Sequence, residues 1–357
     1  MIKPNRLKKG DKVAVVSLSS GILGEDYCKH QLKLGIQRLH EFGLEPVFMK
    51  NSLKGVEYLY NNPKARAEDL KEAFQNPEIK AVISSIGGDE TYKILPYLFE
   101  DEEFKKAVKE NPKIFMGYSD TTNNHLMFYK LGLVTYYGPA FLTDFAELDK
   151  NMLKYTENAI KTMFTPKNQL FIESSTTWFT EREDFSEKEL NKSRILKIES
   201  KNYEVIYGSG KIYGKLLGGC LESLYDGYTG NRYIEQKAIY EKYDLMPGIS
   251  EWKNKIMFIE TSEEKINPKE FKKYLNTFAD LGILSAISGL LVGKPIDEVY
   301  YHEYKSILTK FAQKHNLSIL YNLNFGHSYP RTIIPYGVNV ELDLDNKYVK
   351  IMEKIVE

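Results

Sequence analysis

The chain has 357 residues, a length that favours two domains over one. Its 49 lysines and arginines balance its 49 aspartates and glutamates and form no long basic block, which argues against nucleic acid or an anionic membrane as the main partner. The charged start after Met1, the lack of any apolar run near the roughly 20 residues of a membrane span, and the 2 cysteines predict a cytoplasmic protein without a signal peptide or a disulfide framework.

The first part of the chain alternates strand-like and helix-like segments. Short apolar runs that end in small or polar residues predict strands at 12–20, 45–50, 79–88 and 113–120. Apolar residues at helical spacing, bounded by glycine or proline, predict helices at 29–43, 63–77 and 89–98. Strands separated by helices imply right-handed crossovers and a parallel sheet covered on both faces. The binding crevice of such a sheet lies at the carboxyl ends of its strands.

A polar, Ser/Thr-rich and charged stretch without a clear period occupies about 167–202. Long loops of this kind in compact proteins are usually functional or disordered. Strand-to-helix units return from Ile212 onward. We therefore expect an α/β fold with a parallel-sheet, flavodoxin/Rossmann-like domain over 1–166, a connecting loop over 167–204, and a smaller α/β domain over 205–357.

Ser119 is the first candidate for chemistry, because it lies at the corner between the apolar run Ile114–Met116 and a helix-like segment from Thr121 on. A serine on such a turn presents its hydroxyl beside the first amides of the helix, which can stabilise an oxyanion. The alternative is a plain turn with a helix cap, since Ser and Asp are preferred N-caps. The string is not G-x-S-x-G, because Thr121 replaces the second glycine.

A serine nucleophile needs a base, and the chain has six histidines. Four of them suit solvated positions: His30, His40, His302 and His315. His125 lies one turn into the helix after Ser119, where we expect it to pack beneath the corner. His327 follows an apolar strand and a glycine on an irregular loop, the kind of position where α/β proteins carry functional groups. By elimination His327 is the best base.

The base needs an orienting acid, and Glu260 is the better candidate because it closes the apolar run "IMFIE". A charge after buried positions is costly unless it is paired. Glu263 and Glu264 are expected to start the next helix, where carboxylates usually favour the helix dipole. Their presence then needs no catalytic explanation.

Two glycine pairs also occur next to predicted strands. Gly87-Gly88-Asp89 ends a strand and could offer a backbone N–H to an oxyanion. Gly218-Gly219 could merely permit close backbone packing. Neither pair fits a nucleotide-binding fingerprint, and no H-x-x-x-H or paired cysteines suggest a metal site.

In order along nearly the whole chain, several strings resemble the LD-carboxypeptidase/MccF family of serine peptidases. They are "SIGGDE" (85–90), "MGYSDTT" (116–122), "LLGGCLESL" (216–224), "FIETSEE" (258–264) and "FGHSYPRTIIPYG" (325–337). The opening "LKKGDKVAVVSLSSG" and the "ARAEDL" helix fit as well.

This resemblance implies a Ser-Glu-His triad in which the N-terminal domain supplies Ser119 and the C-terminal domain supplies Glu260 and His327. It places the oxyanion hole at the amides of Gly88 and Asp120, with Gly87 and Asp89 among the substrate-binding residues. It implies neither a metal nor an organic cofactor, and it suggests a homodimer.

Two features favour the MccF-like branch over the murein LD-carboxypeptidases. Murein enzymes typically carry Gly-Gly-Tyr-Gly where this chain has Gly87-Gly88-Asp89-Glu90, and they have a shorter interval than 228–255 before the catalytic acid. Trp178 matches a loop tryptophan that stacks on a nucleotide base, although it could equally be a hydrophobic anchor for its loop.

The expected function is therefore hydrolysis of an amide in aminoacyl or peptidyl nucleotides such as processed microcin C. The alternatives are removal of a terminal D-alanine from murein tetrapeptides, and a catalytically silent binding protein on the same fold.

Overall fold

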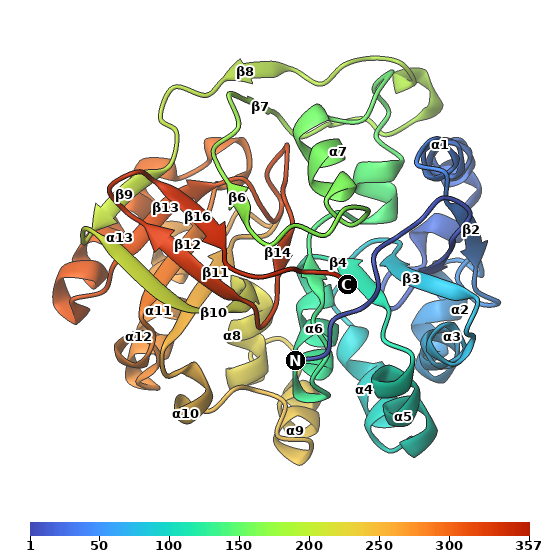
Figure 1. Ribbon diagram of the computed structural model, residues 1–357, viewed down its shortest axis with the longest axis horizontal. Helices are drawn as coiled ribbons and strands as arrows, with labels where there is room; N and C mark the ends of the chain where they lie inside the picture. The colour runs from blue at the N-terminus through green and yellow to red at the C-terminus, as the bar shows by residue number, and fades with distance from the viewer. The chain divides into compact units, whose positions relative to one another are not determined.

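The computed structural model describes residues 1–357 and divides into two compact units (Figure 1). Unit 1 comprises Met1–Pro166, Arg182–Arg194 and Ile355–Glu357, and unit 2 comprises Lys167–Glu181 and Ile195–Lys354. The segment 167–204, expected as a connecting loop, is thus shared between the units. None of the helices has the length and apolar character that crossing a bilayer requires.

Unit 1 is built on a parallel sheet, as its alternating pattern predicts. Its strands follow the order β5-β4-β3-β1-β2, and each neighbouring pair is parallel. The bounds are β1 (Lys12–Val16), β2 (Glu45–Phe48), β3 (Ile79–Ser84), β4 (Ile114–Gly117) and β5 (Tyr136–Tyr137). Strand order reverses direction at β1, and α/β sheets bind ligands at such switch points.

Helices cover both faces of this sheet, with α1 and α7 on one face and α3 and α5 on the other (Figure 1). Their bounds are α1 (Lys29–Glu41), α2 (Val56–Asn61), α3 (Pro63–Gln75), α4 (Leu95–Phe99), α5 (Glu102–Glu110), α6 (Thr122–Lys130) and α7 (Lys154–Lys161). Strands β1, β3 and β4 are buried almost throughout because both faces are covered, which explains their uninterrupted apolar runs, whereas the edge strand β2 is partly exposed.

Unit 2 contains an eight-stranded mixed sheet in the order β6-β16-β15-β10-β11-β12-β13-β9. Strands β10 to β13 are parallel to one another, and the strands on either side are antiparallel. The bounds are β6 (Leu170–Ile172), β9 (Glu204–Tyr207), β10 (Lys211–Cys220), β11 (Lys255–Glu260), β12 (Gly289–Gly293), β13 (Ile319–Leu323), β15 (Asn339–Asp343) and β16 (Tyr348–Ile351). The short β14 is Ile334–Pro335.

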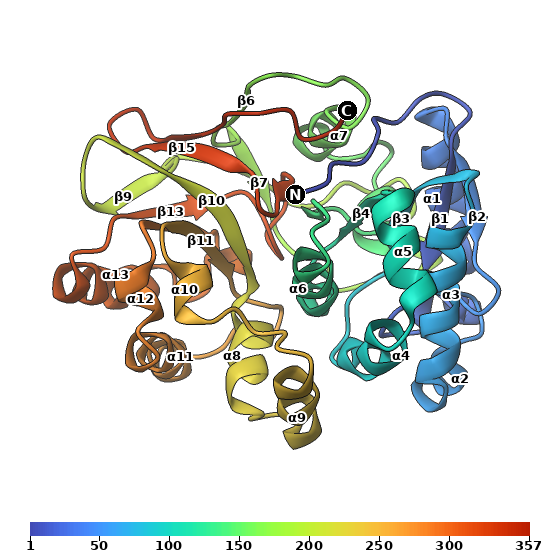
Figure 2. The ribbon, with the colours of Figure 1, turned by 60° about the horizontal axis from the view of Figure 1, so that its bottom comes forward.

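The helices of unit 2 gather along one face of its sheet (Figure 2). They are α8 (Leu221–Thr229), α9 (Ile234–Lys242), α10 (Ile249–Trp252), α11 (Pro268–Asp280), α12 (Ile283–Ala286) and α13 (Tyr301–His315). With its two segments together, unit 2 is slightly shorter than unit 1.

The segment 167–204, expected as a connecting loop without a clear period, contains short strands. The segment contains β6, which pairs with β16, and the two-stranded ribbon of β7 (Thr177–Phe179) and β8 (Leu196–Ile198). These three-residue strands are too short for a periodic signal, and they are stabilised by partners elsewhere in the sequence.

Candidate active site

Ser119 lies on a sharp turn at the carboxyl end of β4. All of β4 is buried, Tyr118 is extended, and Ser119 then adopts a left-handed backbone with φ 63° before a single 3-10 turn leads into α6. A serine in this conformation is uncommon, and strained residues of this type cluster at functional sites. The hydroxyl of Thr122 donates to the Ser119 carbonyl oxygen at 2.7 Å and fixes the turn.

The Gly87-Gly88 turn after β3 lies directly against this corner. A Cβ at Gly87 would come within 2.8 Å of the Ser119 Cβ and 3.0 Å of its Oγ, and it would lie 3.5 Å from the Asp120 amide nitrogen. Gly88 has φ +142°, and a Cβ there would lie 2.4 Å from the Ser19 Oγ. The structure therefore places Gly87 and the Asp120 amide beside Ser119, while Gly88 packs against Ser19. The roles of nucleophile and oxyanion donors stay predictions. Asp89 is exposed on the same turn.

The Asp120 side chain is directed into the protein and supports the turn. Its Oδ2 accepts from the Thr91 amide at 2.8 Å and its Oδ1 accepts from the Asn123 side chain at 2.6 Å. Burial raises the pKa of Asp120 to about 6, although hydrogen bonds from Thr91 and Ser19 and the Arg66 charge oppose the shift. Only the backbone N–H of Asp120 is thus placed to act on a reacting group.

Arg66 from the "ARAEDL" helix holds the loop after β1. Its side chain is completely buried and donates to the carbonyl oxygens of Leu18 and Ser19 at 3.1 and 3.3 Å. The Ser19 hydroxyl in turn accepts from the Glu90 amide at 3.0 Å. The loops after β1 and β3 are therefore fixed to each other around the glycine pair.

His125 is buried beneath the corner, which confirms its predicted packing role. Its two ring nitrogens lie 2.9 Å from the Gly117 carbonyl oxygen and 2.8 Å from the Thr135 hydroxyl. Burial lowers the pKa of His125 to about 3, so the ring is neutral and structural.

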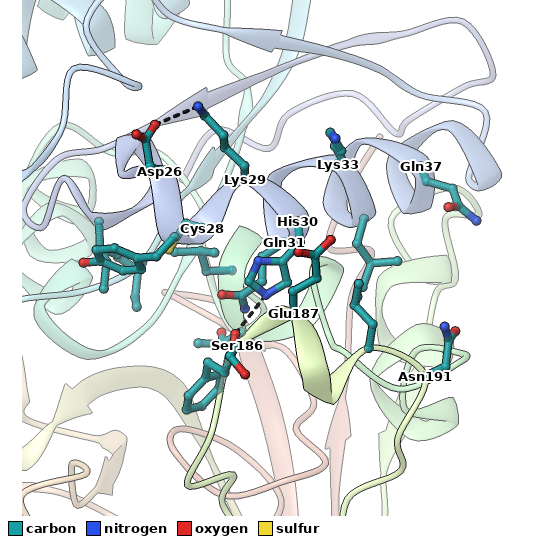
Figure 3. A pocket seen from close by; sticks show the side chains of 18 residues that line it. Asp26, Cys28, Lys29, His30, Gln31, Lys33, Gln37, Ser186, Glu187 and Asn191 are labelled. Carbon is teal, nitrogen blue, oxygen red and sulfur yellow. Dashed lines mark hydrogen bonds and ion pairs between the residues drawn. The ribbon is translucent and has the colours of Figure 1, made fainter.

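A cavity of about 980 Å³ lies in unit 1 between α1 and the segment Arg182–Arg194 (Figure 3). His30, expected on a solvated face, instead lies at this cavity, with its Nε2 2.9 Å from the Phe185 carbonyl oxygen. Ile86, next to Gly87, forms part of the wall. Buried Glu147 binds both Arg182 and Arg194 at 2.7 Å and fixes the two ends of the covering segment.

Glu260 and His327 lie in contact in unit 2. Glu260 is the last residue of β11, and its Oε2 lies 2.7 Å from the His327 Nδ1 and accepts from the His327 amide at 3.1 Å. Both side chains are buried, at 1% and 7% exposure. An orienting carboxylate on Nδ1 fixes the tautomer and the direction of Nε2, which is what a general base requires.

Glu263 contacts the other ring nitrogen and was missed as a functional candidate. Its Oε2 lies 2.8 Å from the His327 Nε2, while its side chain is 65% exposed. Burial lowers the pKa of His327, but the Glu260 and Glu263 carboxylates outweigh burial and raise it to about 10. The hydrogen bond with His327 holds the pKa of Glu263 at about 2.

The expectation that Glu263 and Glu264 start a helix is wrong, because they lie in a turn and α11 begins at Pro268. The Asn267 side chain caps this helix by accepting from the amides of Lys269 and Glu270. Asn-Pro is a stronger start signal than an acidic pair, and it could have placed Glu263 on the loop.

The turn that carries Glu263 is anchored on a buried glutamate of α8. Glu222 Oε1 accepts from the Ser262 amide at 2.9 Å and from the Ser262 hydroxyl at 2.8 Å. Burial, together with the nearby Glu260 charge, raises the pKa of Glu222 to about 7.

Trp178 lies on β7 and is half-buried. The Lys294 ammonium lies 4.8 Å from its ring centroid, and this buried lysine also binds Glu199 at 2.9 Å. The next residue, Phe179, donates its amide to the Tyr329 carbonyl oxygen at 2.9 Å, which ties β7 to the loop after His327. Trp178 is thus packed on a cation and remains partly accessible.

Comparison with known proteins agrees with this architecture. Residues 13–138 match the LD-carboxypeptidase N-terminal domain, and residues 213–342 match the LD-carboxypeptidase C-terminal domain. The chain is 29% identical over 336 residues to the microcin C7 self-immunity protein MccF of Escherichia coli, covering 91% of this chain and 89% of that protein.

Solved structures give the same result. The MccF-like protein from Streptococcus pneumoniae, in complex with AMP, is 45% identical with a TM-score of 0.91, covering 96% of this chain and 98% of that one. MccF in complex with aspartyl sulfamoyl adenosine is 26% identical with a TM-score of 0.82 over the full length of both chains. With both domain models matched in order and a likeness of 45% over nearly the whole length, this chain belongs to the LD-carboxypeptidase/MccF family of serine peptidases.

Proposed function

We propose that the chain is a serine hydrolase in which Ser119 is the nucleophile, His327 the general base and Glu260 the orienting acid. The observation that carries the proposal is the left-handed Ser119 at the end of β4, with Gly87 too close to tolerate a Cβ. The 2.7 Å contact between Glu260 and the His327 Nδ1 supports it, because this pair has the acid–base geometry that a serine nucleophile needs.

The reaction proceeds through an acyl-enzyme. The Ser119 Oγ attacks the carbonyl carbon of the scissile amide while His327 Nε2 takes the hydroxyl proton. The amides of Gly88 and Asp120 stabilise the oxyanion, the C–N bond breaks, and His327 returns the proton to the leaving amine. Water then repeats the sequence on the ester, which releases the acid and restores Ser119.

For the substrate we propose aminoacyl or peptidyl nucleotides, cleaved at the amide of the acyl part. Two relatives support this class: the Streptococcus pneumoniae protein was solved with AMP, and MccF was solved with aspartyl sulfamoyl adenosine. The accessible part of the Trp178 ring offers a surface on which a nucleobase could stack. We also propose that the protein is a homodimer and that it is located in the cytoplasm.

A side-by-side assay tests this function. Purified protein and its Ser119→Ala variant receive an aminoacyl sulfamoyl adenosine or a murein tetrapeptide, and released product is measured by mass spectrometry. We expect cleavage of the nucleotide substrate and a loss of roughly 10⁴- to 10⁶-fold in the variant. Cleavage of the tetrapeptide alone would identify a murein LD-carboxypeptidase. Binding of either compound without turnover would identify a silent binding protein.

A further inference from the structure

The His327 ring lies between two carboxylates, and the proposed triad uses only one of them. Glu260 Oε2 lies 2.7 Å from Nδ1, and Glu263 Oε2 lies 2.8 Å from Nε2. Nε2 is the atom that must accept the nucleophile's proton. Glu263 thus engages the ring nitrogen that must be free to accept a proton in the proposed mechanism.

This geometry defines the protonation state of the ring. A neutral imidazole has one N–H, so one of its nitrogens would point a lone pair at a carboxylate oxygen. The pKa of Glu263 is held at about 2 by its hydrogen bond with His327, so Glu263 is a carboxylate, and with two carboxylates only the imidazolium, donating from both nitrogens, satisfies both contacts. A protonated ring cannot act as a general base, so this arrangement is a resting state that must open before Ser119 can be activated.

We propose that Glu263 is a positioning residue for His327, which holds the protonated ring while the site is empty and is displaced from Nε2 when substrate enters. The Nε2 proton then leaves to solvent, and the neutral ring, still held by Glu260, becomes the base. This inference rests on the function proposed above.

The local structure suits a side chain that moves on a fixed backbone. Ser262 anchors the turn through its two bonds to buried Glu222. The Glu263 side chain is 65% exposed, so water can solvate its carboxylate once it leaves the ring. By contrast, the neighbouring Glu264 is held by Arg232 and does not contact His327.

The two carboxylates in contact with the His327 ring both raise its pKa. Glu260 and Glu263 both favour the imidazolium and raise the pKa of His327 to about 10 against the effect of burial. Arg232 lies near enough to add a charge interaction that lowers the pKa of Glu263. Glu222 repels the Glu260 charge and accepts a hydrogen bond from the Cys220 thiol. Removing the Glu263 charge should therefore make His327 easier to deprotonate.

Steady-state kinetics of Glu263→Gln separates the free enzyme from the complex. The pH dependence of kcat/KM reports groups of the free enzyme, and that of kcat reports groups of the enzyme–substrate complex. We expect the acid limb of kcat/KM to move down by about one pH unit or more, a gain of roughly tenfold on that limb, with the kcat profile unmoved. The matched control is Glu264→Gln, which removes an equal charge from the same turn and should move neither profile. An unmoved kcat/KM profile in Glu263→Gln would overturn the proposal.

A second measurement does not depend on turnover. NMR titration of the histidine ring signals, with His327 assigned by its absence in His327→Gln, should show a lower midpoint for His327 in Glu263→Gln than in the wild-type protein. An equal midpoint overturns the role of Glu263 whatever the activity. A lowered midpoint in a protein that cleaves no substrate overturns the proposed function and leaves the hold of Glu263 on the ring supported.

Discussion

Gly326 lies so close to Glu260 that a Cβ on this glycine would fall 2.2 Å from the glutamate Cγ and Cδ and 2.4 Å from Oε2. Gly326 also has φ +78°, a conformation that favours glycine. The backbone just before His327 therefore packs directly against the Glu260 carboxylate, and the His327 amide donates to this carboxylate at 3.1 Å. A second glycine, Gly293 at the end of β12, makes room for the Glu260 Cβ on the other side.

Gly326→Ala should displace Glu260 from the His327 Nδ1. A misplacement of about 1 Å at a catalytic group costs roughly 10²-fold in rate, so we expect a loss of about that size in kcat/KM. Gly248→Ala is the control, because φ there is −73° and a Cβ would meet nothing within 4 Å. Circular dichroism checks that both variants are folded. Wild-type kcat/KM in Gly326→Ala would show that the triad tolerates a shifted acid.

Glu260→Gln tests the orienting acid without changing its size. An amide cannot stabilise the imidazolium that forms on His327 and can bind the wrong tautomer, so kcat should fall by about 10⁴-fold. The buried side chain should stay in place, so a crystal structure should show an unchanged loop at His327. A near-normal kcat would remove Glu260 from the mechanism.

Much of the fold could be predicted from the sequence because both units rely on strands with continuous apolar runs and helices with clear end signals. The strand at Ile114–Gly117 and the turn at Ser119 follow directly from such a run stopping at Gly-Tyr-Ser-Asp. His327 and Glu260 could be singled out because both follow apolar strand residues, and strand ends are where α/β proteins place functional groups.

The features that sequence reasoning missed depend on tertiary contacts. β7 and β8 are three residues each and pair across a long interval, so no local period predicts them. The contact of Glu263 with His327 joins residues 64 positions apart. The sequence pattern of Glu263 and Glu264 instead predicted the first turn of a helix. His30 contacts a carbonyl oxygen 155 positions later in the chain, which an amphipathic helix pattern cannot reveal.

Trp178→Ala tests the nucleotide part of the proposal. If the ring stacks on a base, binding of an aminoacyl sulfamoyl adenosine should weaken by about 1–3 kcal/mol, while a substrate without a base should be nearly unaffected. Trp178→Phe keeps an aromatic face over Lys294 and should retain most of the binding. Binding to Ser119→Ala protein can be measured by calorimetry without turnover. An equal loss for every substrate would identify Trp178 as an anchor of β7.

The buried Glu222 should make stability depend on pH in a defined direction. Burial and the Glu260 charge raise its pKa from 4.5 to about 7 in the folded protein. Between these two pH values the folded state holds a proton that the unfolded state has lost, so the free energy of unfolding falls as pH rises. The stabilisation of the folded protein by protonated Glu222 is fully present below about pH 4.5 and is lost as the pH rises through about 7. It amounts to roughly 3 kcal/mol at most.

Glu222→Gln keeps a neutral side chain at every pH and should remove this decline. Urea unfolding at pH 5 and pH 8 gives, for each protein, the change in unfolding free energy between the two pH values. The change in the wild-type protein minus the change in Glu222→Gln is the part of the decline that Glu222 causes. Other titrating groups, including Asp120, are present in both proteins and largely cancel in this difference. The exposed Glu103 provides the control, because Glu103→Gln should leave the pH dependence of the wild type intact. If wild type and Glu222→Gln lose equal stability between the two pH values, Glu222 is ionised in the folded protein and the Ser262 bonds hold it as a carboxylate.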